Sequence, residues 1–231
     1  MNVAIVKYNA GNIYSVVNAL RRLGVEPLLT DDPEQLMKAE RVLFPGQGEA
    51  SNCMRYLKEH QLDTVIKDLR QPVLGICIGQ QLLCRHSEEG DTDCIGVFDV
   101  DVKRFQPQNH QDKVPCMGWN TLNFKGNEGA WERGSEGTGE RGNEGTGERG
   151  NEGTGVRKSD LFAGLGNNPY VYFVHSYYVP ICEWTVAETQ YILPYSAALQ
   201  KDNFQTCQFH PEKSGKVGEK ILEQFLRQQT K

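Results

Sequence analysis

Residues 73 to 83 read VLGICIGQQLL and carry the most informative pattern in this 231-residue chain. The first half is an apolar run typical of a buried strand, and the second half can continue as a helix. Cys77 stands at the junction, between Gly75 and Gly79. A tight strand-to-helix turn strains its central residue and leaves no room for neighbouring Cβ atoms. The stretch therefore predicts a nucleophile elbow with Cys77 at its tip.

The elbow position suits a reactive cysteine. The dipole and the free N–H groups at a helix N-terminus favour the thiolate. The backbone N–H of Ile78 can donate to a developing oxyanion, and Gln81 follows one turn later on the same helix face as Cys77. A cysteine at a buried strand end is also commonly a small apolar core residue. The elbow alone leaves both interpretations open.

A second motif, QFHPE at residues 208 to 212, favours catalysis. His210 and Glu212 stand on either side of a proline that fixes the backbone. Because residues two apart in an extended segment share one face, Glu212 can accept a hydrogen bond from the imidazole of His210. That bond would set the tautomer and leave the other nitrogen for a thiol. The alternative is an unremarkable surface His and Glu.

The N-terminal half alternates short apolar runs with helical stretches. The runs cover residues 3–6, 27–29, 42–44 and 73–77. Asn12 is expected to cap a helix that ends at Gly24. Apolar strands without polar alternation, interleaved with helices, indicate a mainly parallel sheet covered on both faces.

The C-terminal half is rich in β-branched and aromatic residues, which favour strands. Strands are expected at residues 96–105, 119–124, 171–179 and 184–188, followed by a terminal helix capped by Ser214. We therefore expect one α/β domain over residues 1–231. It should have three α/β/α layers, a mostly parallel central sheet and antiparallel edge strands.

A Gly- and Glu-rich insert interrupts the second half, with an eight-residue repeat that starts at residues 126, 134, 142 and 150. Glycine at this density costs chain entropy and offers little apolar surface to bury. We expect a poorly ordered loop at about 126–155. A folded solenoid is the alternative, but only Trp131 supplies an apolar residue to the repeat.

Composition excludes several classes of function. The formal net charge of −5 and the scattered basic residues argue against a nucleic-acid partner. The first apolar run is too short for a signal peptide or a membrane span, so we expect a cytoplasmic protein. The seven cysteines include no C-x-x-C pair, which argues against a structural metal site and indicates a reducing compartment.

Taken together, G-x-C-x-G-x-Q and the distal H-P-E resemble the signatures of the class I glutamine amidotransferases. Five further segments resemble one group in that family, the glutaminase subunits of imidazole glycerol phosphate synthase. The segments are YNAGNIYSV (8–16), FPGQG (44–48), MGWN (117–120), YFVHSY (172–177) and QFHPEKSG (208–215). The resemblance covers the whole chain except the repeat.

The resemblance implies a role for each matching residue. Cys77 would be the nucleophile, His210 the general base and acid, and Glu212 its orienting partner. The implied oxyanion hole comprises Gly46, Gln47 and Ile78, and the implied substrate-binding residues are Gln81, Glu89, Ser176 and Tyr177. Asn12, Met117 and Trp119 fall on segments that face the partner in the family. His175, in contrast, is expected to be a structural histidine whose ring nitrogens find partners.

Three positions depart from the family pattern without affecting the triad. Gln47 stands where valine is usual, Gln80 where methionine is common, and Lys7 where an acidic residue is frequent. Of these, Gln47 bears most directly on regulation, because the resemblance implies that the partner switches the loop to which it belongs.

The implied activity is hydrolysis of glutamine through a cysteine thioester, with the ammonia passed to a (β/α)8-barrel synthase subunit in a heterodimer for histidine biosynthesis. No metal or organic cofactor is implied. Two alternatives stay open: the glutaminase subunit of another amidotransferase, and a catalytically silent homologue that keeps the fold.

Overall fold

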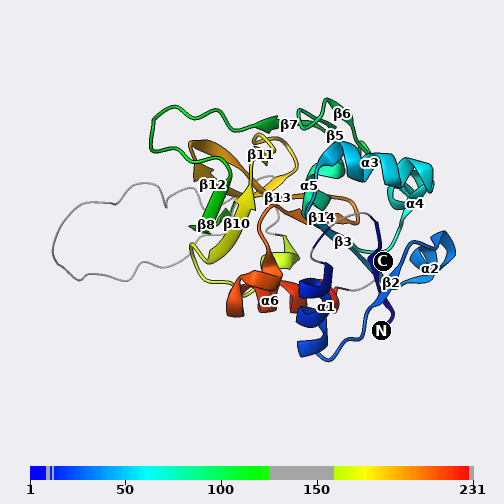
Figure 1. Ribbon diagram of the computed structural model, residues 1–231. Coiled ribbons are helices and arrows are strands. Elements are labelled where there is room, and N and C mark those ends of the chain that lie inside the picture. Colours follow the sequence, from blue (N-terminus) through cyan, green and yellow to red (C-terminus); the bar gives the residue numbers. More distant parts are fainter. Residues whose placement is uncertain (9–10, 12, 125–158, 229–231) are drawn as a thin grey trace, which may run out of the picture.

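The computed structural model describes residues 1–8, 11, 13–124 and 159–228. Two expectations lie outside these residues: Asn12 as a helix cap and partner contact, and the loop at about 126–155. The described residues form an α/β architecture around one eight-stranded sheet (Figure 1).

The central sheet is mostly parallel, as expected. Its five strands at one end run parallel, and the three at the other end pair antiparallel. In spatial order the strands are β2 (Leu28–Thr30), β1 (Val3–Val6), β3 (Arg41–Gly46), β4 (Val73–Cys77), β14 (Phe204–Cys207), β13 (Leu193–Lys201), β12 (Thr185–Tyr191) and β9 (Asn123–Phe124).

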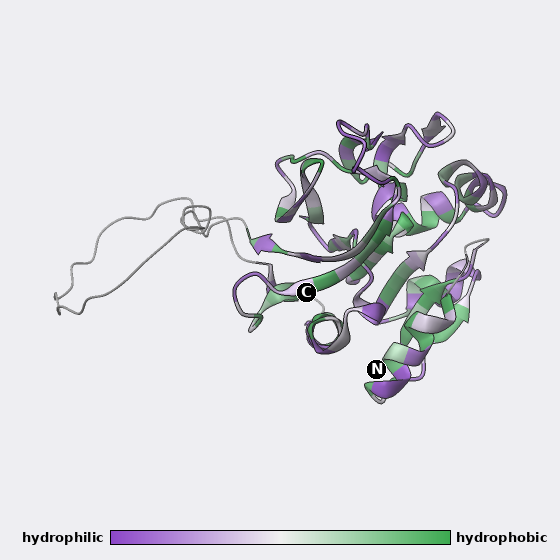
Figure 2. Ribbon diagram, turned by 60° about the vertical axis from the view of Figure 1, so that its left-hand side comes forward, coloured by the Kyte–Doolittle hydropathy of each residue, from purple (hydrophilic) through white to green (hydrophobic). Residues whose placement is uncertain are grey.

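The pleat of β1 explains the three layers, because alternate residues of a strand point to opposite faces. Val3 and Ile5 belong to one apolar cluster and Ala4 and Val6 to another. The first cluster includes α1 (Ile13–Arg22) and α6 (Gly215–Arg227); the second includes α2 (Pro33–Lys38), α3 (Ala50–Glu59), α4 (Leu62–Asp68) and α5 (Ile78–Leu82). Figure 2 shows the apolar residues concentrated on the central strands between these helices. The predicted fold class is confirmed.

Two smaller sheets accompany the central sheet. One contains β11 (Tyr177–Tyr178), β7 (Phe98–Arg104), β5 (Cys84–Ser87) and β6 (Thr92–Asp93), and the other pairs β10 (Tyr170–His175) with β8 (Cys116–Thr121). The single strand expected at residues 119–124 is wrong. The chain turns at Leu122, which is fully buried and donates its N–H to the carbonyl of Pro169. β8 and β9 therefore enter different sheets.

The helix ends agree with the sequence in part. Helix α1 ends at Arg22, and Gly24 adopts a φ of +78°, where a glycine avoids the steric cost of a Cβ atom. Ser214 precedes α6, but its side chain does not cap the helix. The Ser214 hydroxyl instead donates to the carbonyl of His210 and accepts from the N–H of Tyr172, so it ties the His210 segment to β10.

The arrangement of β3, β4 and β14 positions the candidate site. β4 lies between the other two, with Cys77 paired to Gly46 and Ile76 paired to Cys207. All three strands run parallel, so their carboxyl ends meet at one edge, where open α/β sheets bind ligands. No helix in the described residues is long and apolar enough to cross a membrane.

Candidate active site

The elbow at Cys77 is built by close backbone packing. Cys77 adopts φ 55° and ψ −108°, a strained conformation for a residue with a side chain. A Cβ atom on Gly79 would lie 1.8 Å from the carbonyl oxygen of Phe44, and one on Gly75 would lie 3.0 Å from the carbonyl oxygen of Gly79. Glycine at both positions therefore lets β3, β4 and α5 approach closely enough to make the turn.

His210 reaches the elbow because β14 runs parallel to β4 and ends beside it. The η2 turn (Pro211–Lys213) follows and brings Glu212 back to the ring, so that Nδ1 of His210 donates to Oε1 of Glu212 at 2.8 Å. Both side chains are only 2% exposed. The Nε2 atom of His210 has no hydrogen-bond partner within range among the described residues, which leaves it free for the thiol or the substrate.

The electrostatics of His210 favour its protonated form. Burial alone would lower the pKa of the imidazole, but charge and hydrogen-bonding interactions with Cys77 and with Glu212 outweigh it and raise the pKa to about 10. Nε2 makes no well-formed hydrogen bond to the sulfur, yet the two groups lie close enough for their interaction to raise the imidazole pKa. His210 therefore carries a proton at neutral pH that it can transfer to a leaving group.

A cavity of about 280 Å³ opens beside Cys77 and brings most of the expected site residues together. Its walls include the expected residues Gln47, Cys77, Ile78, Gln81, Glu89, Ser176 and Tyr177. Gly46 lies next to this cavity, as the neighbour of Gln47 and the strand partner of Cys77. Gly48, Pro115, Val174 and His175 also line it.

Two wall residues have contacts that define their orientation. The side-chain amide of Gln81 donates to the carbonyl of Tyr177 at 3.1 Å. The Glu89 carboxylate accepts the N–H of Ala50, the first residue of α3, at 2.8 Å. Burial raises the pKa of Glu89 in this half-buried position. Both polar groups thus line the cavity beside Cys77.

The loop that follows β3 is more exposed than the elbow. Gln47 is half-buried and Gly48 exposed, and the carbonyl of Gln47 accepts the N–H of Gly11 at 2.7 Å. Gly46 keeps its register with Cys77. The expected oxyanion segment is therefore fixed to the sheet at Gly46 and to the N-terminal loop at Gln47.

Two expected partner residues lie on an exposed strand. Met117 and Trp119 are 65% and 56% exposed on β8, while Tyr170 on the paired strand β10 is 60% exposed. Pro115, just before β8, lines the active-site cavity. This strand therefore leads from the cavity to an exposed aromatic surface, whereas Asn12 is not described.

Sequence reasoning missed one residue at the nucleophile. The buried side chain of Gln208 lies with Nε2 3.7 Å from the sulfur of Cys77. Its place two residues before His210 in the QFHPE motif was the available signal. His175, expected to be structural, has both ring nitrogens partnered, by Tyr177 and Tyr195, and burial lowers its pKa to about 4.

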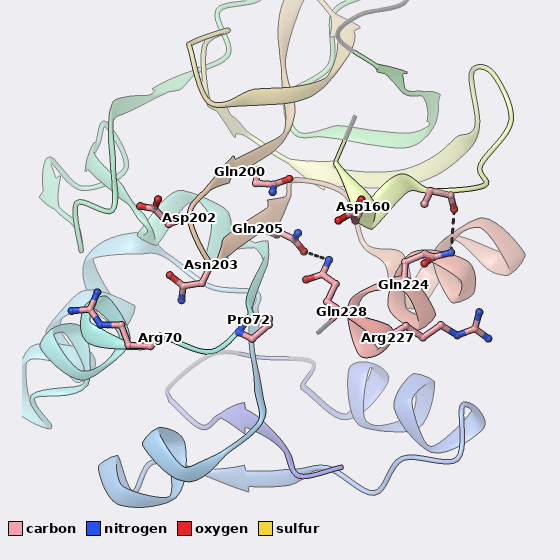
Figure 3. A pocket seen from close by; sticks show the side chains of 11 residues that line it. Arg70, Pro72, Asp160, Gln200, Asp202, Asn203, Gln205, Gln224, Arg227 and Gln228 are labelled. Carbon is pink, nitrogen blue, oxygen red and sulfur yellow. Dashed lines mark hydrogen bonds between the residues drawn. The ribbon is translucent and has the colours of Figure 1, made fainter. Parts of the chain in front are cut away.

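A larger cavity among the described residues lies elsewhere and does not contain these groups. It measures about 580 Å³ and lies at the other end of the strands, near Pro72 and Asn203, which precede β4 and β14 (Figure 3). Its walls combine side-chain amides with charged residues, among them Arg227 and Asp160. No group of three or more His, Cys, Asp or Glu side chains in the described part of the chain is arranged to hold a metal ion.

Comparison with known families agrees with this geometry. Residues 4–229 match the family model for "Glutamine amidotransferase class-I". The chain belongs to the class I glutamine amidotransferases. The match spans both the elbow and the His210 segment, so it covers the whole candidate site.

Closer relatives place the chain within that family. It is 55% identical over 226 residues to "Imidazole glycerol phosphate synthase subunit HisH" of Bacteroides thetaiotaomicron, covering 98% of this chain and 99% of the relative. It is 38% identical over 228 residues to the HisH subunit of Escherichia coli K12, covering 98% and 99%. The chain is therefore a member of the HisH group, the glutaminase subunits of imidazole glycerol phosphate synthase in histidine biosynthesis.

Solved structures support the fold alone, because their sequence identity is low. A structure titled "Crystal structure of glutamine amidotransferase" has a TM-score of 0.65 at 16% identity and covers 98% of this chain and 97% of its own. "Structure of PurLQS from Thermotoga maritima" has a TM-score of 0.61 at 15% identity and covers 97% of each chain. The class I amidotransferase fold is shared despite this divergence.

Proposed function

We propose that this HisH-type chain hydrolyses glutamine at Cys77 and delivers the ammonia to a (β/α)8-barrel synthase subunit in the cytoplasm. The observation that carries the proposal is the meeting of an elbow cysteine with a buried His–Glu pair at one sheet edge. The resemblance to HisH subunits supports the choice of partner, and the exposed Met117 and Trp119 offer a surface for it.

The first half-reaction uses Cys77 as a thiolate and His210 as the proton donor. The Cys77 thiolate attacks the side-chain amide carbon of glutamine, forming an S–C bond and moving electrons onto the amide oxygen. Backbone N–H groups of the Gln47 loop and Ile78 are the proposed donors to that oxyanion. His210 gives its proton to the amide nitrogen, the C–N bond breaks, and ammonia leaves. The product on the enzyme is a γ-glutamyl thioester.

The second half-reaction regenerates the site. His210, now neutral at Nε2, takes a proton from water, and the resulting hydroxide attacks the thioester carbon. The S–C bond breaks, the sulfur leaves as thiolate, and glutamate is released. Glu212 keeps the imidazole in the orientation needed for both proton transfers.

A Cys77→Ala variant in complex with the barrel subunit tests whether glutamine hydrolysis and synthesis take place on different subunits. Glutamine-dependent synthesis should fall by on the order of 10⁴-fold or more, as for nucleophiles in comparable triads. Synthesis from added ammonium salts should be unchanged, because the synthase site is on the other subunit. Cys94→Ala, at a thiol outside the cavity, is the control and should retain both activities. Loss of both activities in Cys77→Ala would contradict the proposal.

A further inference from the structure

Gln208 contacts the candidate nucleophile from a fully buried position. Its Nε2 atom lies 3.7 Å from the sulfur of Cys77, a suitable distance for a sulfur acceptor, whose radius exceeds that of oxygen. Its backbone N–H is bonded to the carbonyl of Ala197, which fixes the residue to the sheet. The side chain therefore approaches the sulfur from a rigid support.

The direction of the Gln208 amide follows from its neighbours. Gln81 donates one N–H to the carbonyl of Tyr177 at 3.1 Å and the other to Oε1 of Gln208 at 3.0 Å. Because Oε1 of Gln208 accepts this bond, the amide turns its NH₂ group toward Cys77. Gln81 and Tyr177 both line the cavity. A chain of hydrogen bonds therefore leads from the cavity wall to the sulfur.

The sulfur has a second contact that favours the opposite protonation state. The thiol can donate to the carbonyl of Val174 at 3.9 Å, which suits a neutral S–H group. A thiol is a weak donor, however, whereas an N–H that donates to an anion makes a strong bond. The contact with Gln208 therefore outweighs the contact with Val174 once the sulfur is ionised.

We propose that Gln208 donates an N–H to the Cys77 thiolate, and so stabilises and aims the nucleophile before glutamine arrives. The inference rests on the proposed function, since it assigns the thiolate its catalytic use. Gln81 acts through Gln208 as well as on substrate, because it holds the amide in the donating orientation.

The other titratable groups around the sulfur are accounted for. Burial raises the pKa values of Tyr8, Tyr195 and Cys207 well above their ordinary range, so these groups are neutral at neutral pH. His175 is neutral as well. Three charged or titratable groups remain near Cys77: His210, which is protonated, its partner Glu212, and Glu89 in the cavity wall. All three are left in place by a substitution at Gln208.

The test compares Gln208→Met with Gln80→Met in the full chain. Gln80 is an equally buried glutamine on the elbow helix, but its amide bonds to Ser196 and Thr206 and not to the sulfur. Alkylation of Cys77 by iodoacetamide is followed across pH by peptide mass spectrometry, with the Cys94 peptide as an internal reference. Burial raises the pKa of Cys94 to about 12, so that thiol should react slowly in every variant.

Gln208→Met should move the midpoint of the Cys77 alkylation profile upward by about one pH unit, a tenfold change in the ionisation equilibrium. Gln80→Met should leave the midpoint unchanged. Gln81→Met keeps the Gln208 amide but removes the donor that orients it, so it should give a smaller upward shift of the midpoint. This variant tests the inference if Gln208→Met does not fold. Equal midpoints in wild type, Gln208→Met and Gln81→Met would overturn the inference.

Glutaminase activity of the wild-type complex separates this inference from the proposed function. An active complex with no midpoint shift in the variants refutes the role of Gln208 alone. An inactive wild-type complex whose Cys77 midpoint still shifts in Gln208→Met would instead refute the glutaminase proposal and leave the sulfur contact standing.

Discussion

The nucleophile and the expected oxyanion loop lie on adjacent strands of the same sheet, yet they are held very differently. Cys77 and the residues around it are buried, and Gly79 packs so closely on Phe44 that no side chain fits between them. The loop at Gln47 is partly exposed and bonds through its carbonyl to Gly11. The fold thus fixes the nucleophile more tightly than the adjacent loop.

This difference suggests a division of roles between the two regions. The buried Cys77, His210 and Glu212 need no partner to take up their arrangement, because β4 and β14 position them. The loop can change its peptide orientation at lower cost, since it is more exposed than the elbow. We therefore expect substitutions on the nucleophile side to destroy activity and those on the loop to change how activity is regulated.

Gly79→Ala should have the largest effect, because it disrupts the close backbone packing that forms the elbow at Cys77. The added methyl group would lie 1.8 Å from the carbonyl oxygen of Phe44, so β3 and α5 must separate. We expect a loss of about 3 kcal/mol or more in the free energy of unfolding, measured by urea denaturation, together with loss of glutaminase activity. Gly166→Ala, where the same methyl group meets nothing within 4 Å, is the matched control. Equal stabilities for the two variants would contradict the packing argument.

Glu212→Gln should have the next largest effect. It removes the charge that helps to raise the pKa of His210, and the rate of glutamine hydrolysis in the complex should fall by on the order of a thousandfold, less than for Cys77→Ala. NMR titration should show a pKa for His210 below the wild-type value of about 10. Glu219→Gln, at an exposed residue of α6, is the control and should leave that titration unchanged.

The same shift predicts a pH dependence of stability. Since the pKa of His210 is raised from 6.5 to about 10 on folding, its protonation stabilises the native state fully below pH 6.5. That contribution should be lost as the pH rises through about 10. Between these limits the unfolding free energy should decline with rising pH, from about pH 6.5 in both proteins, because that onset is set by the unfolded state. In Glu212→Gln the decline should end at a lower pH than in wild type, because the folded-state pKa of His210 is lower. Parallel pH profiles would show that Glu212 does not support the charged imidazole.

Gln47→Val should have a smaller effect, confined to regulation. One oxyanion donor contributes on the order of a hundredfold in rate, so a loop that turns its N–H away can hold the isolated chain nearly silent. We expect the barrel subunit with its ligand to activate wild type strongly, and Gln47→Val to change mainly the unstimulated glutaminase rate. A full rate in the isolated chain, unaltered by partner or substitution, would refute loop switching and leave the triad chemistry intact.

Deletion of the Gly-rich insert should have the smallest effect. Replacing residues 126–155 with a short linker removes a segment with little apolar surface, so stability and activity should change little. Limited proteolysis of the intact chain should cut there first. Unfolding of the deletion variant, or failure to bind the barrel subunit, would mean that the repeat is an ordered element.

The sequence predicted the elbow well because its signals are local. An apolar run, a cysteine and two glycines within five residues are enough to predict the turn. β14 was not foreseen, because Gln205 and Thr206 make its sequence look polar. Both side chains are nevertheless buried and satisfied, Gln205 by Gln228 and Thr206 by Gln80. Partners so distant in sequence leave no periodic pattern.

The same limit applies to the site. The pairing of His210 with Glu212 followed from a spacing of two residues, whereas the contact of Gln208 with Cys77 spans 131 positions. Ser214 illustrates the converse: its position before α6 suggested a cap, but tertiary contacts with His210 and Tyr172 use its hydroxyl instead. Long-range hydrogen bonds of this kind require the three-dimensional structure.

The most direct test of the assigned active site is to determine which residue a glutamine-mimicking electrophile modifies. The full chain, bound to the barrel subunit, would be treated with a chloroketone analogue of glutamine and mapped by peptide mass spectrometry. The account predicts that label appears on Cys77 alone among the seven cysteines, in proportion to lost glutaminase activity, and that excess glutamine prevents it. Label on another cysteine with loss of activity, or labelling of Cys77 that glutamine does not slow, would contradict the assignment of this site.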